Sequence, residues 1–267
     1  MNSTNQMSFL LEIAVESLPA AQAAQRAGAD RIELCADLSQ GGLTPTADLM
    51  RQVRAALHIP IFAMIRPRLG NFLYTDSEFA TMQSQISQAR DLAMDGIVLG
   101  ILTASHHIDI HRTAQLIQHA RPLPVTFHRA FDEAPRASLD IDGLKPLCKS
   151  EDSDVLSDPD APAYPDLFTA LDDVIATGAT RLLTSGGAPS APEGASQIRQ
   201  LIQAAANRII VMPGAGIQPT NFPALRRITQ AQEFHAGLGT VLPYNSSDYS
   251  AFESQIRQLT SQKSHPT

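Results

Sequence analysis

The sequence predicts a single-domain α/β fold, the (β/α)8 or TIM barrel, and three observations support this expectation. Short apolar segments alternate with segments of helical period along most of the chain. Several apolar segments end on a polar or ionisable side chain, among them Glu33, Arg66 and His128, and the chemistry of such barrels gathers at the carboxyl ends of their strands. The length of 267 residues is typical of one barrel, so a second large domain is not expected.

Eight strands are expected, because eight short apolar runs recur between the helical segments. In chain order they are Phe9–Val15, Arg31–Cys35, Pro60–Arg66, Gly96–Ile101, Leu123–His128, Arg181–Thr184, Arg208–Met212 and Glu233–His235.

A helix is expected after each strand, and local signals mark several helix ends. Ser17 caps the first helix, which has Pro19 in its first turn and ends at Gly28. Asp109 caps the fourth helix in the same way. The predicted helical segments are 18–27, Thr46–Leu57, Asp76–Ala93, Ile110–Ala120, Asp166–Thr177, Glu193–Ala206, Pro219–Ile228 and Ser247–Thr260.

The alternation is interrupted after the fifth strand, where residues 134–165 are rich in Ser, Asp and Pro. A stretch of this length without strong periodicity is expected to be mobile and exposed, with Leu139–Leu147 as its helix-compatible segment. The expected organisation is a flexible N-terminus over residues 1–8, a barrel over 9–246 that contains this insertion, and a C-terminal helix and tail over 247–267.

Composition and charge exclude several classes of protein. The net charge of −7 argues against a nucleic-acid or anionic-membrane partner, and no apolar run approaches the roughly 20 residues that span a bilayer. The polar segment Met1–Ser8 lacks the features of a signal peptide, and the two cysteines, Cys35 and Cys148, are not expected to form a disulfide. A cytoplasmic protein is therefore expected. None of the three lysines lies in or just after a predicted strand, which excludes a Schiff-base mechanism.

The fifth strand carries the sharpest candidate for chemistry. Alternation places Thr126 and His128 on one face of this strand and its aliphatic and aromatic residues on the other. His128 would then point into the barrel near its mouth, where an imidazole can move a proton or ligate a metal. The alternative is a hydrogen-bonded core histidine. Arg129 and Asp132, which follow directly, are added as candidate ligand-binding residues.

Acidic residues are expected inside the barrel at its first two strands. Glu33 and Cys35 share one face of the second strand, and Glu12 projects inward from the first. Buried carboxylates need partners, and Arg66 at the end of the third strand is the expected one. Either these groups form a structural Glu–Arg network, or Arg66 holds an anionic ligand while Glu33 or Glu12 takes a proton.

Glycine-rich turns follow the last three strands. Gly214 and Gly216 follow the seventh strand, and Gly237 follows His235, itself a candidate ligand-binding residue at the end of the eighth. Turns in these positions frequently bind phosphate in barrels of this kind, because glycine lets backbone N–H groups approach an anion. Thr184 and Gly187, after the sixth strand, are expected to add further donors.

Several segments resemble the CutC family, which is associated with copper homeostasis. The resemblance lies in Ala-Gly-Ala-Asp-Arg-Ile-Glu-Leu-Cys at 27–35, Gly-Gly-Leu-Thr-Pro at 41–45, Pro-Val-Thr-Phe-His-Arg-Ala-Phe-Asp at 124–132 and Leu-Thr-Ser-Gly-Gly at 183–187. It implies a cytoplasmic barrel, often dimeric or larger, with a role in copper handling. The family commonly has cysteine where this chain has Ala14 and aspartate where it has Asn71. Because soft thiolates favour copper(I), the absence of a cysteine at position 14 leaves Cys35 as the one cysteine in the predicted strands.

Two functions therefore remain open. In the first, which follows the resemblance, the protein binds a copper ion through Cys35 and His128 without catalysis, and no other cofactor is required. In the second, it is a lysine-independent enzyme acting on a small anionic metabolite, such as a phosphorylated sugar. His128 and Glu33 would move protons, Arg66 would hold the anion, and the glycine turns would bind phosphate. The resemblance also implies a homodimer or larger homo-oligomer.

Overall fold

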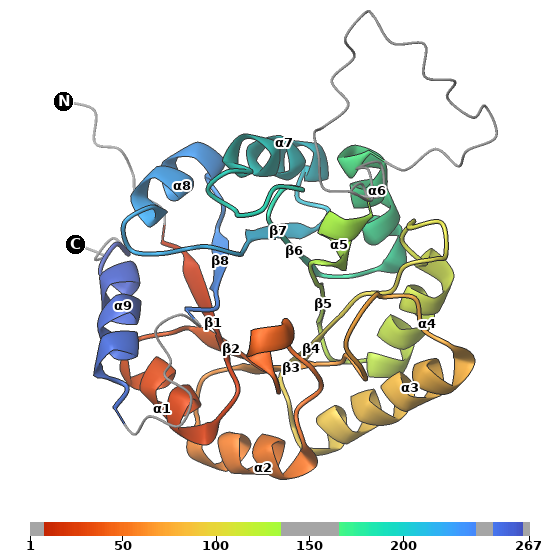
Figure 1. Ribbon diagram of the computed structural model, residues 1–267, viewed down its shortest axis with the longest axis horizontal. Coiled ribbons are helices and arrows are strands. Elements are labelled where there is room, and N and C mark those ends of the chain that lie inside the picture. The colour runs from red at the N-terminus through yellow and green to blue at the C-terminus, as the bar shows by residue number, and fades with distance from the viewer. Residues whose placement is uncertain (1–7, 135–165, 239–247, 264–267) are drawn as a thin grey trace, which may run out of the picture.

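The computed structural model describes residues 8–134, 166–238 and 248–263. Its strands form a ring with the helices packed outside it (Figure 1). The strands are β1 (Leu10–Val15), β2 (Arg31–Leu34), β3 (Ile61–Met64), β4 (Gly96–Leu99), β5 (Val125–Phe127), β6 (Arg181–Thr184), β7 (Ile210–Pro213) and β8 (Glu233–Ala236). The predicted TIM barrel and its eight strands are confirmed, most strands being somewhat shorter than expected.

The helices follow the strands in the expected alternation. They are α1 (Leu18–Arg26), α2 (Ala47–Ala56), α3 (Asp76–Asp91), α4 (Ile110–Ala120), α6 (Leu167–Thr177), α7 (Ala195–Ala205), α8 (Phe222–Thr229) and α9 (Ser250–Thr260). Two short helices were not predicted, η1 (Leu38–Gln40) and α5 (Ala130–Glu133). The predicted caps are present, since the Ser17 hydroxyl accepts from Ala20 N and the Asp109 carboxylate accepts from Arg112 N.

The predictions for the insertion fall almost wholly on residues 135–165, including Leu139–Leu147, and these lie outside the described residues. The same holds for residues 1–7. Among the helices that the structure describes, none combines the length and the apolar character needed to cross a membrane.

Strand pairing leaves one seam in the ring. All ladders are parallel and run without a break from β7 through β6, β5, β4, β3 and β2 to β1, and β1 then pairs with β8. In the described part of the chain no ladder joins β7 to β8. The two strands still lie side by side here, and side chains add contacts that connect them.

Alternation along each strand separates the outer core from the barrel interior. On β2, Ile32 and Leu34 belong to the large apolar core shared with the helices. The alternate residues, Arg31, Glu33 and Cys35, are also buried but contact residues inside the ring. The period-two prediction for this strand is therefore confirmed.

A buried ion-pair network bridges the open seam. Arg31 on β2 donates from Nη2 to Glu233 Oε2 on β8 at 2.7 Å, and Arg181 on β6 donates from Nε to the same oxygen at 2.8 Å. Arg31 Nη2 also lies 3.4 Å from the sulfur of Met212 on β7. Through Nε the same guanidinium pairs with Glu12 on β1. The seam is thus closed by charged side chains from strands on both sides of it.

Candidate functional site

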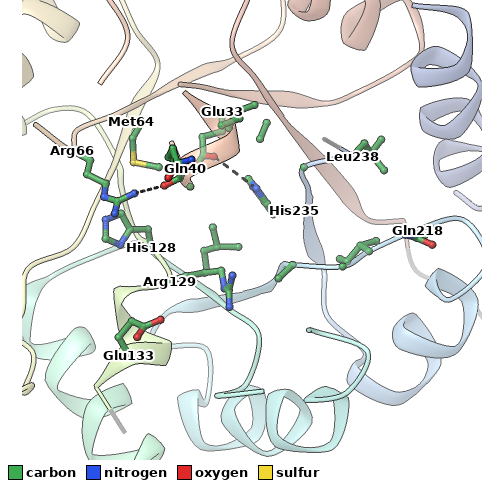
Figure 2. Close-up of a pocket in the computed structure, with 18 of the residues that line it drawn as sticks. Glu33, Gln40, Met64, Arg66, His128, Arg129, Glu133, Gln218, His235 and Leu238 are labelled. Carbon is green, nitrogen blue, oxygen red and sulfur yellow. Dashed lines mark hydrogen bonds and ion pairs between the residues drawn. The ribbon is translucent and has the colours of Figure 1, made fainter. Parts of the chain in front are cut away.

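A cavity of about 560 Å³ opens at the carboxyl ends of the strands. Its wall combines residues from strand ends, from the loops that follow them and from η1 (Figure 2). Of the residues singled out from the sequence, those that line it are Glu33, Arg66, His128, Arg129, Gly216, His235 and Gly237. The strand-end side chains therefore converge on one cavity, as expected for a barrel.

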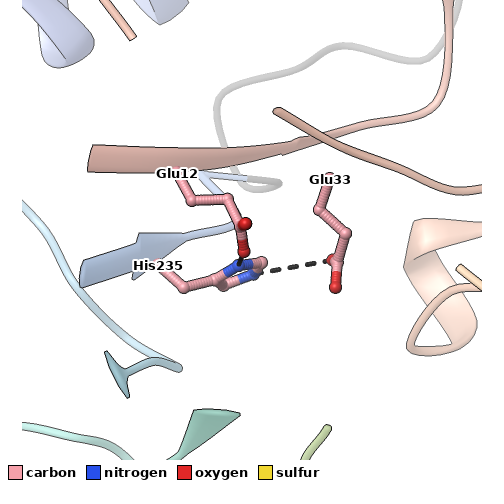
Figure 3. A group of neighbouring side chains, drawn as sticks. All are labelled: Glu12, Glu33 and His235. Carbon is pink, nitrogen blue, oxygen red and sulfur yellow. Dashed lines mark hydrogen bonds and ion pairs between the residues drawn. The ribbon is translucent and has the colours of Figure 1, made fainter. Parts of the chain in front are cut away.

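His235 lies between two buried carboxylates (Figure 3). Its Nδ1 donates to Glu12 Oε1 at 2.8 Å, while its Nε2 lies 3.8 Å from Glu33 Oε2. Strand register explains this arrangement, because β1 pairs Glu12 with His235 of β8 on one side and Ala14 with Glu33 of β2 on the other. This was not foreseen, since the sequence does not reveal which strands are neighbours in register.

Opposing effects set the charges of these groups. Burial raises the pKa of Glu12, but Arg31 and His235 together bring it down to about 2, so Glu12 is a carboxylate. Burial raises the pKa of Glu33, and within the described residues no guanidinium forms an ion pair with it. Burial alone would lower the pKa of His235, but the carboxylates of Glu33 and Glu12 raise it. The space between His235 and Glu33 therefore favours a positive charge.

Arg66 is not the partner of these carboxylates, so that prediction was wrong. Its guanidinium donates to the backbone carbonyls of Gln40 and Gly42, each at 3.2 Å, and of Gly70 at 2.9 Å. It also lies over the Phe72 ring, 5.0 Å from the centroid. Arg66 thus fixes the loops around the cavity.

The carboxylate partner that sequence reasoning missed is Arg31. It precedes Glu33 by two residues on β2 and therefore points to the same side of the strand. The same alternation that drew attention to Glu33 and Cys35 could have identified it.

His128 is a neutral imidazole in this structure. Its Nδ1 accepts a hydrogen bond from Ala130 N at 3.1 Å, so the ring proton must be on Nε2. Burial lowers the pKa of His128, and the nearby charges of Arg66 and Arg129 lower it further, to about 3. Among the described residues its buried Nε2 has no hydrogen-bond partner. This geometry suits an N–H donor better than a metal ligand, because a lone pair on Nε2 would require the proton to move to Nδ1.

Cys35 and His128 have different neighbours. The Cys35 thiol lies 3.5 Å from Glu33 Oε2, to which it donates. Burial raises the pKa of this thiol well above its ordinary value, and the Glu33 carboxylate adds to the shift. Within the described residues, the one group of three or more His, Cys, Asp and Glu side chains close enough to share a metal ion is Glu12, Glu33 and His235.

Asp132 binds the turn after β6 rather than facing the cavity. Its carboxylate, which is completely buried, accepts from Thr184 Oγ1 at 2.6 Å and from Gly187 N at 3.0 Å. It also accepts from the backbone and hydroxyl of Ser185 and from Arg129 Nε. The donors of Thr184 and Gly187 are therefore occupied within the protein, and none of these three residues lines the cavity.

The glycines of the last two turns are present for different structural reasons. A methyl group on Gly214 would lie 2.4 Å from Leu183 Cδ1, so packing alone explains this glycine. Gly216 has a φ of +70°, which favours glycine, and it lines the cavity. Among the described residues, no atom lies within 4 Å of a methyl group placed on Gly237. Gly216 and Gly237 thus leave backbone accessible at the mouth.

The buried His128 is expected to make stability depend on pH. Because its pKa is about 3 in the folded protein and near 6.5 when exposed, the unfolded chain binds one more proton between these values. The free energy of unfolding should therefore fall as the pH drops from 6.5 to 3, with His128 contributing about 1.4 kcal/mol per pH unit. In urea unfolding, His128→Gln should lose this contribution and the exposed His111→Gln should keep it. Identical pH profiles for wild type and His128→Gln would contradict the assignment.

Curated relatives match the chain over part of their length. The human protein named "Copper homeostasis protein cutC homolog" is 48% identical over 134 residues, 49% of this chain and 49% of that protein. A protein of Chromobacterium violaceum described as a family protein CutC is 42% identical over 180 residues, 67% of this chain and 61% of that protein. The chain thus spans about half to three fifths of the length of these relatives.

Solved structures match over more of the chain. The structure of a CutC protein from Streptococcus agalactiae has a TM-score of 0.71 and 31% identity, and covers 85% of this chain and 98% of that one. Phosphoribosylanthranilate isomerase from Thermotoga maritima, with a TM-score of 0.55 and 10% identity over 95% of this chain and 97% of that one, shares the fold alone. The CutC family profile matches residues 9–149 and 162–240. Because this match includes all eight strands of the barrel, the chain belongs to the CutC family.

Proposed function

We propose that this protein takes part in copper homeostasis and binds copper(I) beside the barrel mouth. The observation that carries the proposal is membership of the CutC family, together with the name of its 48% identical human relative. The proposal places the protein in the cytoplasm. It also includes assembly into a homodimer or larger homo-oligomer, as the family resemblance implies.

Two sulfur-bearing side chains support a copper(I) site. Cys35 and Met64 belong to one small buried cluster with Phe62. Both pack against Gly42, where an added methyl group would lie 3.1 Å from Cys35 Sγ and 3.5 Å from Met64 Cε. Thiolate and thioether are the soft donors that copper(I) prefers. Met64 borders the cavity, which gives an ion a route of approach.

Copper binding at Cys35 has to displace a proton. The raised pKa of the buried thiol means that the free protein carries Cys35 as a thiol. Only the thiolate is a strong metal ligand. Glu33 Oε2, at 3.5 Å, is the nearest acceptor for the released proton. Copper(I) affinity should therefore increase with pH.

Anaerobic titration against a chromogenic copper(I) chelator tests this proposal. Wild type should bind one ion per chain, and Cys35→Ser should bind it at least about tenfold more weakly, because the thiolate is lost. Met50→Leu changes a buried methionine in α2, outside the Cys35 cluster, and should bind like wild type. Equal binding by wild type and Cys35→Ser would reject the site.

A second candidate function, catalysis on a small anionic metabolite, is favoured by a different observation. Arg66, Arg129 and His128 border the cavity, as do Gly216 and Gly237. Two guanidinium groups, together with an N–H donor that has no partner among the described residues, suit a phosphate or carboxylate. Glu33, whose pKa burial raises, would be the group that exchanges a proton with this ligand.

Thermal shift with inorganic phosphate and sulfate tests the anion site. If either anion binds, the Tm of wild type should rise with its concentration. Arg129→Met should reduce this rise, whereas Arg51→Met, on the exposed side of α2, should not. No rise for wild type, or the same rise for Arg129→Met, would count against an anionic ligand.

A further inference from the structure

The arrangement of His235 resembles that of a histidine prepared to bind a metal ion. Metal-binding histidines commonly donate from one ring nitrogen to a carboxylate, which fixes the tautomer and leaves the other nitrogen for the ion. His235 donates from Nδ1 to Glu12 Oε1 at 2.8 Å, and its Nε2 faces Glu33 (Figure 3). Glu12 is itself fixed by Arg31, which pairs with its other oxygen.

We propose that His235 Nε2 and the carboxylate of Glu33 bind a divalent zinc-type cation, with Glu12 orienting the histidine. Ligands about 2.0–2.2 Å from one zinc ion lie at most about 4.4 Å apart. The 3.8 Å between His235 Nε2 and Glu33 Oε2 falls within this limit. One ion can therefore bridge the two side chains without a change of backbone.

An unsatisfied oxygen of Glu33 independently indicates a missing ligand. Glu33 is only 3% exposed and lines the cavity. Its Oε1 is buried and has no hydrogen-bond partner among the described residues. Buried carboxylate oxygens are normally paired, because removing one from water without compensation is costly. A cation between Glu33 and His235 would supply that compensation.

Charge balance within the barrel agrees with this inference. Arg31 and Arg181 are matched by Glu12 and Glu233, with which they form ion pairs. Glu33 is the remaining acid of this buried group. The carboxylates of Glu12 and Glu33 lie 2.8 Å and 3.8 Å from the two ring nitrogens of His235, and the negative charge of this group would attract a metal ion.

The donor set selects the class of ion. One imidazole nitrogen and one carboxylate oxygen suit zinc(II) and similar first-row divalent ions, whereas magnesium prefers oxygen alone and copper(I) prefers sulfur. The cavity beside Glu33 and His235 provides room for water at the remaining coordination positions. This site does not depend on the copper(I) proposal, which rests on Cys35 and Met64.

Calorimetric titration of metal-free protein with zinc chloride tests the site. Wild type should bind one zinc ion per chain. His235→Gln and Glu33→Gln should each weaken binding by at least about 100-fold, and Glu12→Gln by about 10–100-fold, since it only orients the histidine. Glu133→Gln alters another carboxylate that lines the cavity and should leave zinc binding unchanged.

The copper(I) titration separates this inference from the proposed function. Cys35→Ser should still bind zinc, and His235→Gln should still bind copper(I). Zinc binding that disappears in Cys35→Ser but persists in Glu33→Gln would overturn the site, as would wild type that binds no zinc.

The cobalt(II) spectrum of wild type gives a second test that needs no variant to fold. The proposed ligands predict visible d–d bands without a strong near-ultraviolet thiolate-to-metal band. A thiolate band would assign the ion to Cys35 and overturn the proposal, and so would a spectrum unchanged from cobalt(II) in buffer.

Discussion

The buried pairing of Glu233 with Arg31 and Arg181 is the interaction on which the rest of the structure depends. It occurs beside the one place in the ring where the described strands lack a ladder, between β7 and β8. Buried charges are costly unless they are fully paired, and here a single carboxylate is bound by guanidinium groups from β2 and β6. The Phe62 ring lies 4.6 Å from the Arg31 guanidinium carbon and 5.4 Å from that of Arg181, which restricts both groups.

The same network positions the candidate site. Arg31 pairs with Glu12 as well as with Glu233, so the charge that closes the barrel also fixes the carboxylate that orients His235. Barrel closure and site geometry are therefore linked through one guanidinium group. A second anchor, Asp132, acts separately by binding the turn after β6. The Arg31 network thus holds His235 in the cavity wall through Glu12, and Asp132 holds Arg129, which also lines the cavity.

The sequence predicted the barrel, the eight strands and the convergence of Glu33, His128 and His235, because period-two alternation and strand-end position determine which side chains reach the mouth. Alternation can identify candidate partners such as Arg31, but which groups pair depends on strand register and loop path. Arg66 was therefore assigned to the carboxylates although loop carbonyls bind it. Asp132 was expected to bind a ligand, but its carboxylate binds the turn after β6. The short helices η1 and α5 were missed because segments of three or four residues carry no measurable period.

Amide hydrogen exchange of Glu233→Gln compared with wild type most directly tests the claim that charged side chains close the barrel. Gln keeps the shape but removes the charge that faces two guanidinium groups, and breaking a buried pair in this way costs about 3–5 kcal/mol. The account predicts that peptides covering β7 and β8 exchange much faster in the variant, while those covering β3 and β4 change little. The exposed-site variant Glu193→Gln should exchange like wild type. Unchanged protection of β7 and β8 in Glu233→Gln would contradict the account.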